Sequence, residues 1–209
     1  MKDHTVKHGD CLTSIAEENG FFWETLWEHP KNAALKEKRK DPTVLLSGDK
    51  VHVPDKREKT ESRGTGARYK FRLKNVPIII TIRLVDDDGN PRTDLAYTIT
   101  VEGKETKGNT GSDGVVTVVA MPSAKVGKLK IDNSDEEYSL QLGHLDPVTE
   151  PSGVQARLKG LGYLKGDVAD SMTPEAKEAL QQYQEDKGLE VTGEADEATQ
   201  ASLVETYGI

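Results

Sequence analysis

The chain has 209 residues, with 28 Lys and Arg against 36 Asp and Glu and a formal net charge of −8. Hydrophobic residues make up 34% and charged residues 31%, which favours two or three small domains over one large core. An acidic chain is poorly suited to bind phosphate backbones, so we expect no nucleic-acid partner. A single cysteine excludes an intramolecular disulfide.

The first part, residues 1–55, reads as strand, helix, helix, strand. Residues 5–8 are expected to form a short strand, after which Asp10 caps a helix that ends at Gly20. Apolar residues at 23, 26 and 27 lie on one face of a second helix. A charged loop is predicted at 36–41, and Val51 and Val53 alternate with His52 in a last strand that Pro54 ends.

This part closely resembles a LysM domain. LysM domains bind polymers that contain N-acetylglucosamine in a shallow groove between two loops. The resemblance rests on Val6, Gly9, Asp10, Leu12, Ile15, Ala16, Gly20, Trp23, Leu26, Asn32, Leu46, Gly48, Asp49, Val53 and Pro54. It implies a groove lined by Asp10, Cys11, Leu12, Asn32, Leu45 and Leu46.

Two uses of such a domain remain open on the sequence. Cys11 stands where the family usually has threonine, and the 36–41 segment is long and charged, so either the groove binds sugar or the fold serves only as an adaptor. The role of the three N-terminal histidines, His4, His8 and His52, is also left open by the sequence. They could approach one another if the first and last strands pair, as a zinc site or, more commonly, as surface residues.

Residues 56–67 are polar, contain two glycines and are predicted to be a flexible linker. Residues 68–146 follow as a set of short strands with turn signals between them. Strands are expected at 76–85, 95–101, 115–119, 129–131 and 138–142, which indicates a small β-sandwich. The densest apolar run, 76–85, is too short to cross a bilayer as a helix, so no membrane insertion is expected.

The segment from Val85 to Val118 resembles the prealbumin-like, immunoglobulin-like domains of bacterial surface and secreted proteins. This resemblance carries no site. The acidic triplet Asp86-Asp87-Asp88 could bind calcium, but it lacks the ligand spacing of a defined calcium loop and reads more readily as a solvated turn. We therefore expect no metal or cofactor.

The third part, residues 147–209, has the pattern of three helices. Ser152 and Gln155 have capping-box spacing, Thr173 precedes a proline at a helix start, and Asp196 can cap a last helix. Gly162, Tyr163, Asp170 and Thr173 recur as Gly188, Leu189, Asp196 and Thr199, which indicates a weak internal repeat.

This part strongly resembles the peptidoglycan-binding domain found beside many cell-wall hydrolases. The motifs are "VQARL" from 154, "LGY" from 161, "TPEA" from 173, "YQ" at 183, "GL" at 188, "TG" at 192 and "DEAT" from 196. The family's glycine-rich first loop is replaced here by "GDVADSMTPEA". The resemblance implies ligand contacts at Tyr163, Tyr183, Gln184 and Thr199, while core packing is the alternative role for the two tyrosines.

No catalytic constellation is recognisable. Cys11 lies at a helix start without a histidine partner motif, and no serine-nucleophile motif is present. The fold class expected is multidomain α+β: a small βααβ domain, a β-sandwich and a three-helix domain. We expect a non-catalytic peptidoglycan-binding and adaptor protein; the alternative is a cell-wall hydrolase, or its accessory subunit, with an unrecognised site.

The first five residues lack an apolar signal-peptide core, so synthesis in the cytoplasm without a secretory signal is expected. This combination of domains resembles accessory proteins of contractile injection machines, such as type VI secretion systems and phage-tail-like particles. The resemblance implies a tail-spike or effector protein as a partner, and delivery to the periplasm or outside by the machine.

Overall fold

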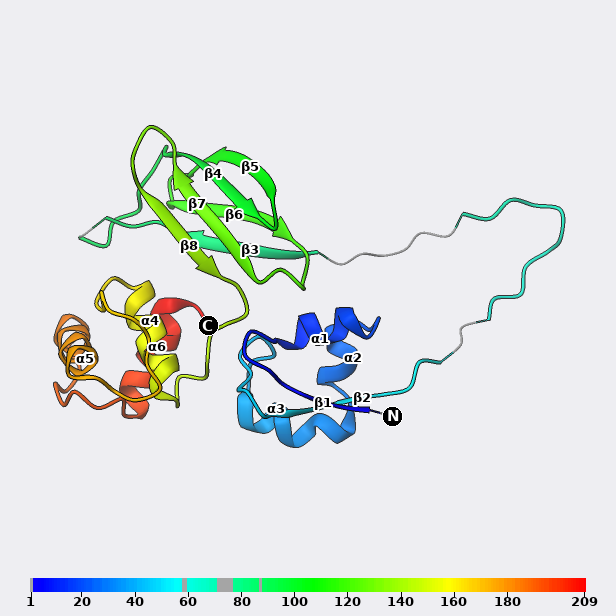
Figure 1. Cartoon of the computed structure of the whole chain (residues 1–209), viewed down its shortest axis with the longest axis horizontal. Coiled ribbons are helices and arrows are strands. Elements are labelled where there is room, and N and C mark those ends of the chain that lie inside the picture. The colour runs from blue at the N-terminus through cyan, green and yellow to red at the C-terminus, as the bar shows by residue number, and fades with distance from the viewer. Residues whose placement is uncertain (1, 58–59, 71–76, 87) are drawn as a thin grey trace.

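The computed structural model describes residues 2–57, 60–70, 77–86 and 88–209. Its buried apolar residues gather in three clusters, which lie between Val6 and Val53, between Ile78 and Leu142, and between Val148 and Leu203. Figure 1 shows the three parts, with residues 60–70 running far from the rest of the molecule. Among the described residues, no helix combines the length and apolarity that crossing a bilayer requires.

The N-terminal part places helices between two short strands. Its elements are β1 (Lys2–Thr5), α1 (Leu12–Glu18), α2 (Trp23–Trp27), the 3-10 helix η1 (Pro30–Asn32), α3 (Ala33–Arg39) and β2 (Lys50–Val53). The first and last strands pair antiparallel, with Asp3 opposite His52 and Thr5 opposite Lys50. The two predicted helices lie between paired end strands as expected, but η1 and α3 are additional to the predicted order of strand, helix, helix, strand.

Three local predictions for this part are wrong. The first strand is Lys2–Thr5 and not residues 5–8, because the chain already turns at Gly9, which has a φ of +82°. Residues 36–39 of the predicted loop belong to α3, since Ala, Leu, Lys and Glu all favour helix. Cys11 occupies the N-cap of α1, while the Asp10 carboxylate accepts from the Lys7 amide instead.

The central part consists of two antiparallel sheets around one core. The strands are β3 (Ile78–Arg83), β4 (Ala96–Val101), β5 (Lys104–Asn109), β6 (Val115–Ala120), β7 (Val126–Ile131) and β8 (Glu137–Gln141). One sheet has the order β3-β6 and the other β5-β4-β7-β8. Alternate residues such as Ile99, Val116 and Leu129 are fully buried between them, as in a two-layer β-sandwich.

The sequence did not predict β5. Its residues, KETKGN, are mostly polar and have low strand propensity, but β5 is an edge strand where charged side chains face water. Glu102 and Gly103 both have positive φ, +48° and +79°, and form the two-residue hairpin turn that folds β5 back onto β4. Position 76 of the predicted first strand and Asp87 of the acidic triplet lie outside the described residues.

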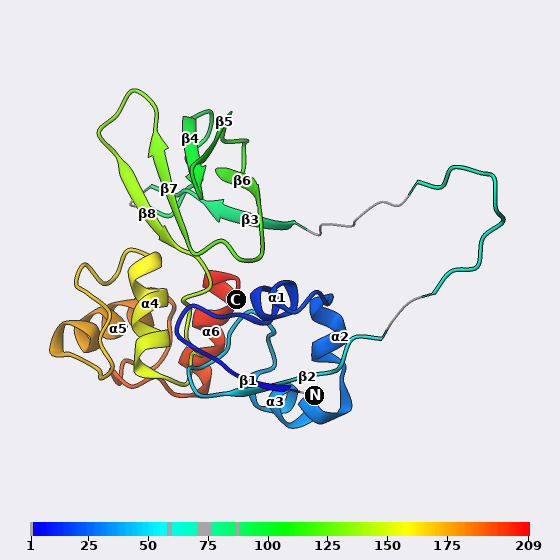
Figure 2. The same ribbon diagram turned by 45° about the vertical axis from the view of Figure 1, so that its right-hand side comes forward.

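The C-terminal part is helical, with α4 (Pro151–Gly160), α5 (Pro174–Asp186) and α6 (Glu197–Tyr207). Thr173 and Asp196 cap α5 and α6, accepting hydrogen bonds from the amides of Ala176 and Thr199 as predicted. The predicted capping box of α4 is wrong: the helix starts at Pro151 after Glu150, and the Ser152 hydroxyl donates to Asp146. Figure 2 shows α4 and α6 beside each other, with α5 on the far side of α4.

Candidate functional site

The two tyrosines predicted to bind a ligand form one aromatic pair in the helical part. Tyr163 and Tyr183 meet edge to face, with ring centroids 5.3 Å apart. Tyr183 has no exposed surface, and its hydroxyl bonds to Ser202 and Thr206 on α6. Tyr163 is half-buried; burial and a hydrogen bond to Asp186 raise its pKa to about 12. Tyr163 is therefore the member of the pair that a ligand can reach.

Gln184 fastens the loop before α6. Its amide nitrogen donates to the Glu194 carbonyl at 2.9 Å and to the hydroxyls of Thr192 and Thr199. Its amide oxygen accepts from the backbone N–H groups of Thr192 and Gly193. Gln184 and Thr199 are both almost completely buried, so in this structure they hold the loop and have no surface with which to touch a polymer.

Gln155 holds the loop before α5 in the same way, and sequence reasoning did not predict this role. Its amide nitrogen donates to the carbonyls of Pro151, Ala169 and Ser171, and its amide oxygen accepts from the Ala169 amide. This is the loop in which the glycine-rich family segment is replaced. The internal repeat aligns Gln155 with Gln181 instead of Gln184, so sequence repetition alone could not reveal the shared role.

Arg157 is a second buried residue that sequence reasoning missed. Only 1% of it is exposed, and its guanidinium donates to the backbone carbonyls of Asp146, Gly153 and Ile209. Burial lowers the pKa of Arg157 from its usual value, with Tyr207 and Asp146 acting in the opposite direction. Arg157 thereby ties the start of α4 to the end of the chain.

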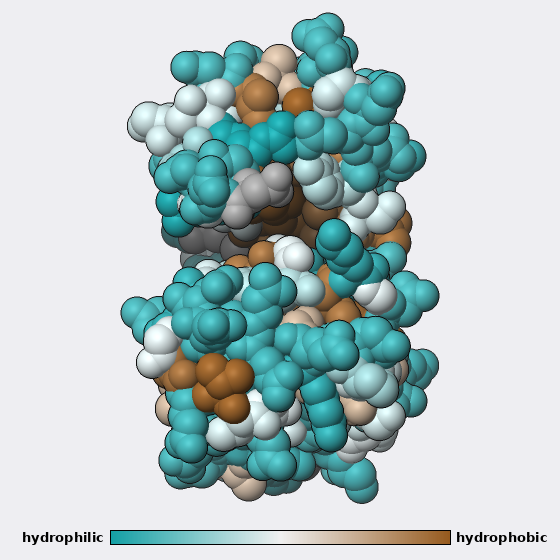
Figure 3. Space-filling model, turned by 90° about the vertical axis from the view of Figure 1, so that its left-hand side faces the viewer, coloured by the Kyte–Doolittle hydropathy of each residue, from teal (hydrophilic) through white to brown (hydrophobic). Residues whose placement is uncertain are grey.

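The helical part carries most of the net negative charge of the protein. Residues 147–209 contain 5 Lys and Arg against 12 Asp and Glu, a difference of −7 out of the total of −8. In Figure 3 the lower lobe, which is the helical part, is largely hydrophilic with small apolar areas between the hydrophilic side chains. Such a surface favours neutral or cationic groups of a binding partner over anionic ones.

The predicted sugar groove of the N-terminal part is mostly closed by packing. Cys11, Leu12, Asn32 and Leu45 are buried in this structure; Asp10 and Leu46 are partly exposed. The Cys11 thiol contacts the hydroxyls of Thr13 and Ser14 on α1. The Asp10 carboxylate is held by His4 at 3.0 Å and by Lys125 at 3.4 Å.

Asn32 has a structural role in the same part. Its side-chain nitrogen donates to the carbonyls of Leu26 and His52, and its oxygen accepts from the His52 amide at 2.7 Å. One buried side chain thus joins α2, η1 and β2. Its polar atoms are directed at the backbone and not at a groove.

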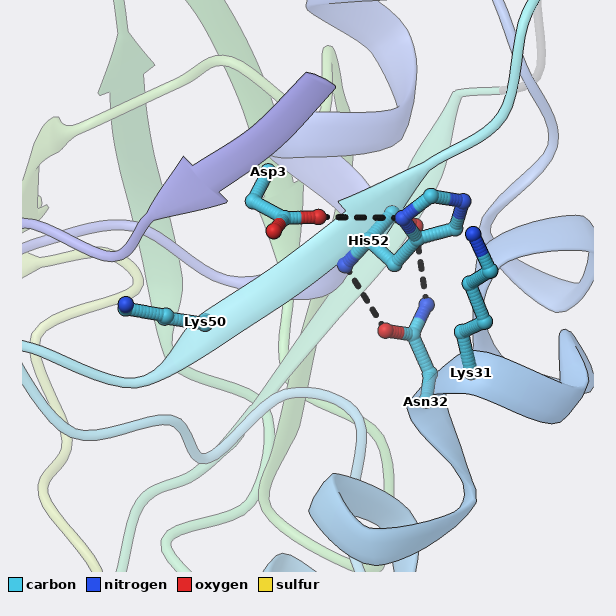
Figure 4. Close-up of a pocket in the computed structure, with 5 residues that line it drawn as sticks. All are labelled: Asp3, Lys31, Asn32, Lys50 and His52. Atoms are coloured by element: carbon cyan, nitrogen blue, oxygen red, sulfur yellow. Dashed lines mark hydrogen bonds and ion pairs between the residues drawn. The ribbon is translucent and has the colours of Figure 1, made fainter. Parts of the chain in front are cut away.

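A shallow pocket of about 370 Å³ lies beside this link, lined by Asp3, Lys31, Asn32, Lys50 and His52 (Figure 4). His52 Nδ1 bonds to the Asp3 carboxylate at 3.0 Å, and this hydrogen bond lowers the pKa of Asp3. Its imidazole also stacks on that of His29, 4.8 Å away. Of the residues predicted to line the sugar groove, Asn32 alone lines this pocket, and its side-chain amide is bonded to the backbone of His52.

The three N-terminal histidines lie apart. Asp3 is opposite His52 in the strand pair, so the neighbouring His4 points to the other face and meets Asp10. His8 lies beyond the end of β1 and contacts His144 of the central part. In the described part of the chain, no group of three His, Cys, Asp or Glu side chains is placed to hold a metal ion.

Comparison with known protein families decides what the helical part is. Residues 149–203 match the family model described as "Putative peptidoglycan binding domain". The C-terminal part is a peptidoglycan-binding domain. The match spans α4, α5 and most of α6, including the tyrosine pair and the loops that Gln155 and Gln184 hold. The comparisons with curated proteins and with solved structures gave no match.

The peptidoglycan-binding domain indicates binding to the cell wall, with peptidoglycan as the partner. The resemblances of the N-terminal part to LysM and of the central part to prealbumin-like domains have no such family match. Within the peptidoglycan-binding domain, Tyr163 is the predicted site residue that combines aromatic character with exposed surface.

Proposed function

We propose that this chain is a non-catalytic adaptor that binds peptidoglycan through its C-terminal domain. The observation that carries the proposal is the family match at residues 149–203. Tyr163, supported from below by the buried ring of Tyr183, offers the kind of rigid aromatic surface on which sugar rings stack. The N-terminal part, with its order of strand, helices and strand, is proposed as a LysM-type module that serves as a second wall contact or as a protein-binding adaptor.

Full-length protein is expected to sediment with insoluble peptidoglycan without lowering the turbidity of the suspension. Replacing Tyr163 with alanine should weaken binding by about fivefold or more, because exposed aromatic anchors commonly contribute more than 1 kcal/mol. Tyr69→Ala is the control: it removes the side chain of an exposed tyrosine that lies outside the peptidoglycan-binding domain.

Sedimentation should be measured at low and at moderate salt, with circular dichroism to show that Tyr163→Ala remains folded. Protein left in the supernatant at both salt concentrations would contradict wall binding. A fall in turbidity, or a cleared band in a zymogram, would instead favour the alternative of a hydrolase.

The adaptor role is proposed to belong to a contractile injection machine. In that setting the chain is made in the cytoplasm, loads onto a tail spike or effector through one module, and is delivered to the periplasm or outside with another module free to meet the wall. Two modules on one chain would gain avidity if both reach the same assembly. The support for this is the domain combination read from the sequence.

Affinity purification of the tagged chain from a native lysate is expected to recover a tail-spike or effector protein. Removal of residues 1–55 should abolish that recovery while leaving sedimentation with peptidoglycan intact. Recovery of the native protein from the periplasm of cells that lack any injection machine would contradict this role.

A further inference from the structure

The N-terminal part contacts the central part through the loop that joins β1 to α1. Figures 1 and 2 both show α1 beside the segment that runs from β8 to α4. Lys125, just before β7, donates to the Gly9 carbonyl and lies 3.4 Å from the Asp10 carboxylate. The Ser123 amide donates to Glu17 on α1 at 2.9 Å. These bonds link residues more than 100 positions apart in the chain.

Two histidines and two glycines complete the contact. His144 Nδ1 and His8 Nε2 are 3.3 Å apart, with their rings nearly perpendicular. A Cβ built on Gly9 would lie 2.7 Å from the His144 ring, and one built on Gly143 would lie 3.1 Å from the Gly9 carbonyl oxygen. Glycine at positions 9 and 143 therefore allows close packing here, because a side chain at Gly9 would meet the His144 ring and one at Gly143 would crowd the Gly9 carbonyl.

Chain connectivity does not impose this contact. Residues 54–77 join β2 to β3, a span long enough for the N-terminal part to lie elsewhere (Figure 1). A tether of this kind supplies an effective concentration in the millimolar range. Contacts of modest strength then keep the two parts together, and a few-fold change in their strength visibly changes the docked fraction.

The charges around His144 make the contact sensitive to acid. His144 contacts His8, and the charges of His8, Lys125 and Asp146 act on it; the nearby Asp10 carboxylate contacts both Lys125 and His4. Burial, followed by the charges of His8 and Lys125, lowers the pKa of His144, and Asp146 offsets part of this effect. Docking therefore favours neutral His144. The contribution of neutral His144 to the stability of the docked state is present above the pKa of the undocked side chain. It is lost as the pH falls through the pKa of the docked side chain.

We propose that this contact is a pH-sensitive latch, in which the central part covers the β1–α1 loop at neutral pH and releases it in acid. The contact surface is residues 8–11 on one side and residues 123–125 and 142–144 on the other. Protonation of His144 places a positive charge against His8 and Lys125 in a partly desolvated site, and the two parts separate. The latch does not depend on peptidoglycan binding.

Cys11 is a built-in reporter of the latch. It is the single cysteine of the chain, it is 8% exposed, and a Cβ built on Gly143 would lie 3.9 Å from its sulfur. Opening of the latch uncovers the thiol, so its rate of reaction with a maleimide measures the open fraction. The Lys125→Glu variant places a negative charge next to Asp10, so the two parts are expected to separate. Its reaction rate is the reference for the undocked state. Both proteins carry the same thiol, so the ratio of their rates cancels the effect of pH on thiol ionisation.

At pH 7.5 the Cys11 thiol of the unchanged protein should react with the maleimide at least about fivefold more slowly than that of Lys125→Glu. The reason is that the variant loses at least one charge-assisted contact. At pH 5.5 the ratio should be smaller than at pH 7.5, because protonation of His144 weakens the docked state of the unchanged protein. His144→Asn keeps a polar atom near the Nδ1 position and cannot be protonated, so it should remain slow at both pH values. Lys107→Glu makes the same charge change on β5, away from the contact, and should behave as the unchanged protein.

Equal rates for the unchanged protein and Lys125→Glu at pH 7.5 would show that the parts do not dock and would overturn the proposal. If the ratio of the two reaction rates stays the same from pH 7.5 to 5.5, protonation does not open the contact. If the His144→Asn variant still opens in acid, His144 is not the group that responds to pH. Circular dichroism at each pH checks that the three parts remain folded.

Discussion

Replacing Tyr183 with alanine is expected to destabilise the peptidoglycan-binding domain by about 3–5 kcal/mol, the range for truncating a fully buried aromatic side chain. Tyr183 has no exposed surface, and its ring supports Tyr163 while its hydroxyl joins α5 to Ser202 and Thr206 of α6. The loss should appear as faster hydrogen exchange of the α5 amides, which reports the stability of this domain separately from the other two parts.

Tyr183→Phe is the control for the hydroxyl group. It keeps the ring and the packing on Tyr163, and it should cost about 1 kcal/mol with peptidoglycan sedimentation preserved. If Tyr183→Phe kept its stability but lost sedimentation, the hydroxyl would be a ligand contact, as the sequence first suggested. Unchanged exchange in Tyr183→Ala would contradict the core position.

Asn32→Ala is expected to destabilise the N-terminal part by about 2–4 kcal/mol. The substitution leaves the Leu26 carbonyl and the amide and carbonyl of His52 without the buried partner that they share. Both tryptophans of the chain, Trp23 and Trp27, lie in the core of this part. Tryptophan fluorescence during urea unfolding therefore follows this part alone.

Asn19→Ala is the matched control for that measurement. Asn19 lies at the end of α1, is partly exposed and donates one side-chain bond, to the Ile15 carbonyl, so its loss should cost under about 1 kcal/mol. Equal urea midpoints for the two variants would show that the link through Asn32 is not the main connection between η1 and β2.

Features that depend on short-range patterns could be predicted from the amino-acid sequence. Thr173 followed by proline, and Asp196 three residues before Thr199, identify helix starts, because a side-chain oxygen there satisfies backbone amides that the helix leaves free. In the central part, alternating apolar residues identified β4, and short apolar runs between turn signals identified β6, β7 and β8. The motifs of the helical part likewise indicated the family that the comparison then matched.

Only the tertiary structure decided what the predicted site residues do. Gln184, Asn32 and Cys11 were placed by resemblance on binding surfaces, but each side chain is buried. The bonding partners of Gln184 lie 8 to 15 residues further along the chain and those of Asn32 up to 20, which no local pattern reveals. The same holds for His8 and His144, 136 positions apart. A polar side chain reads alike in sequence whether it meets a ligand or a backbone, because its role depends on which groups folding leaves without another partner.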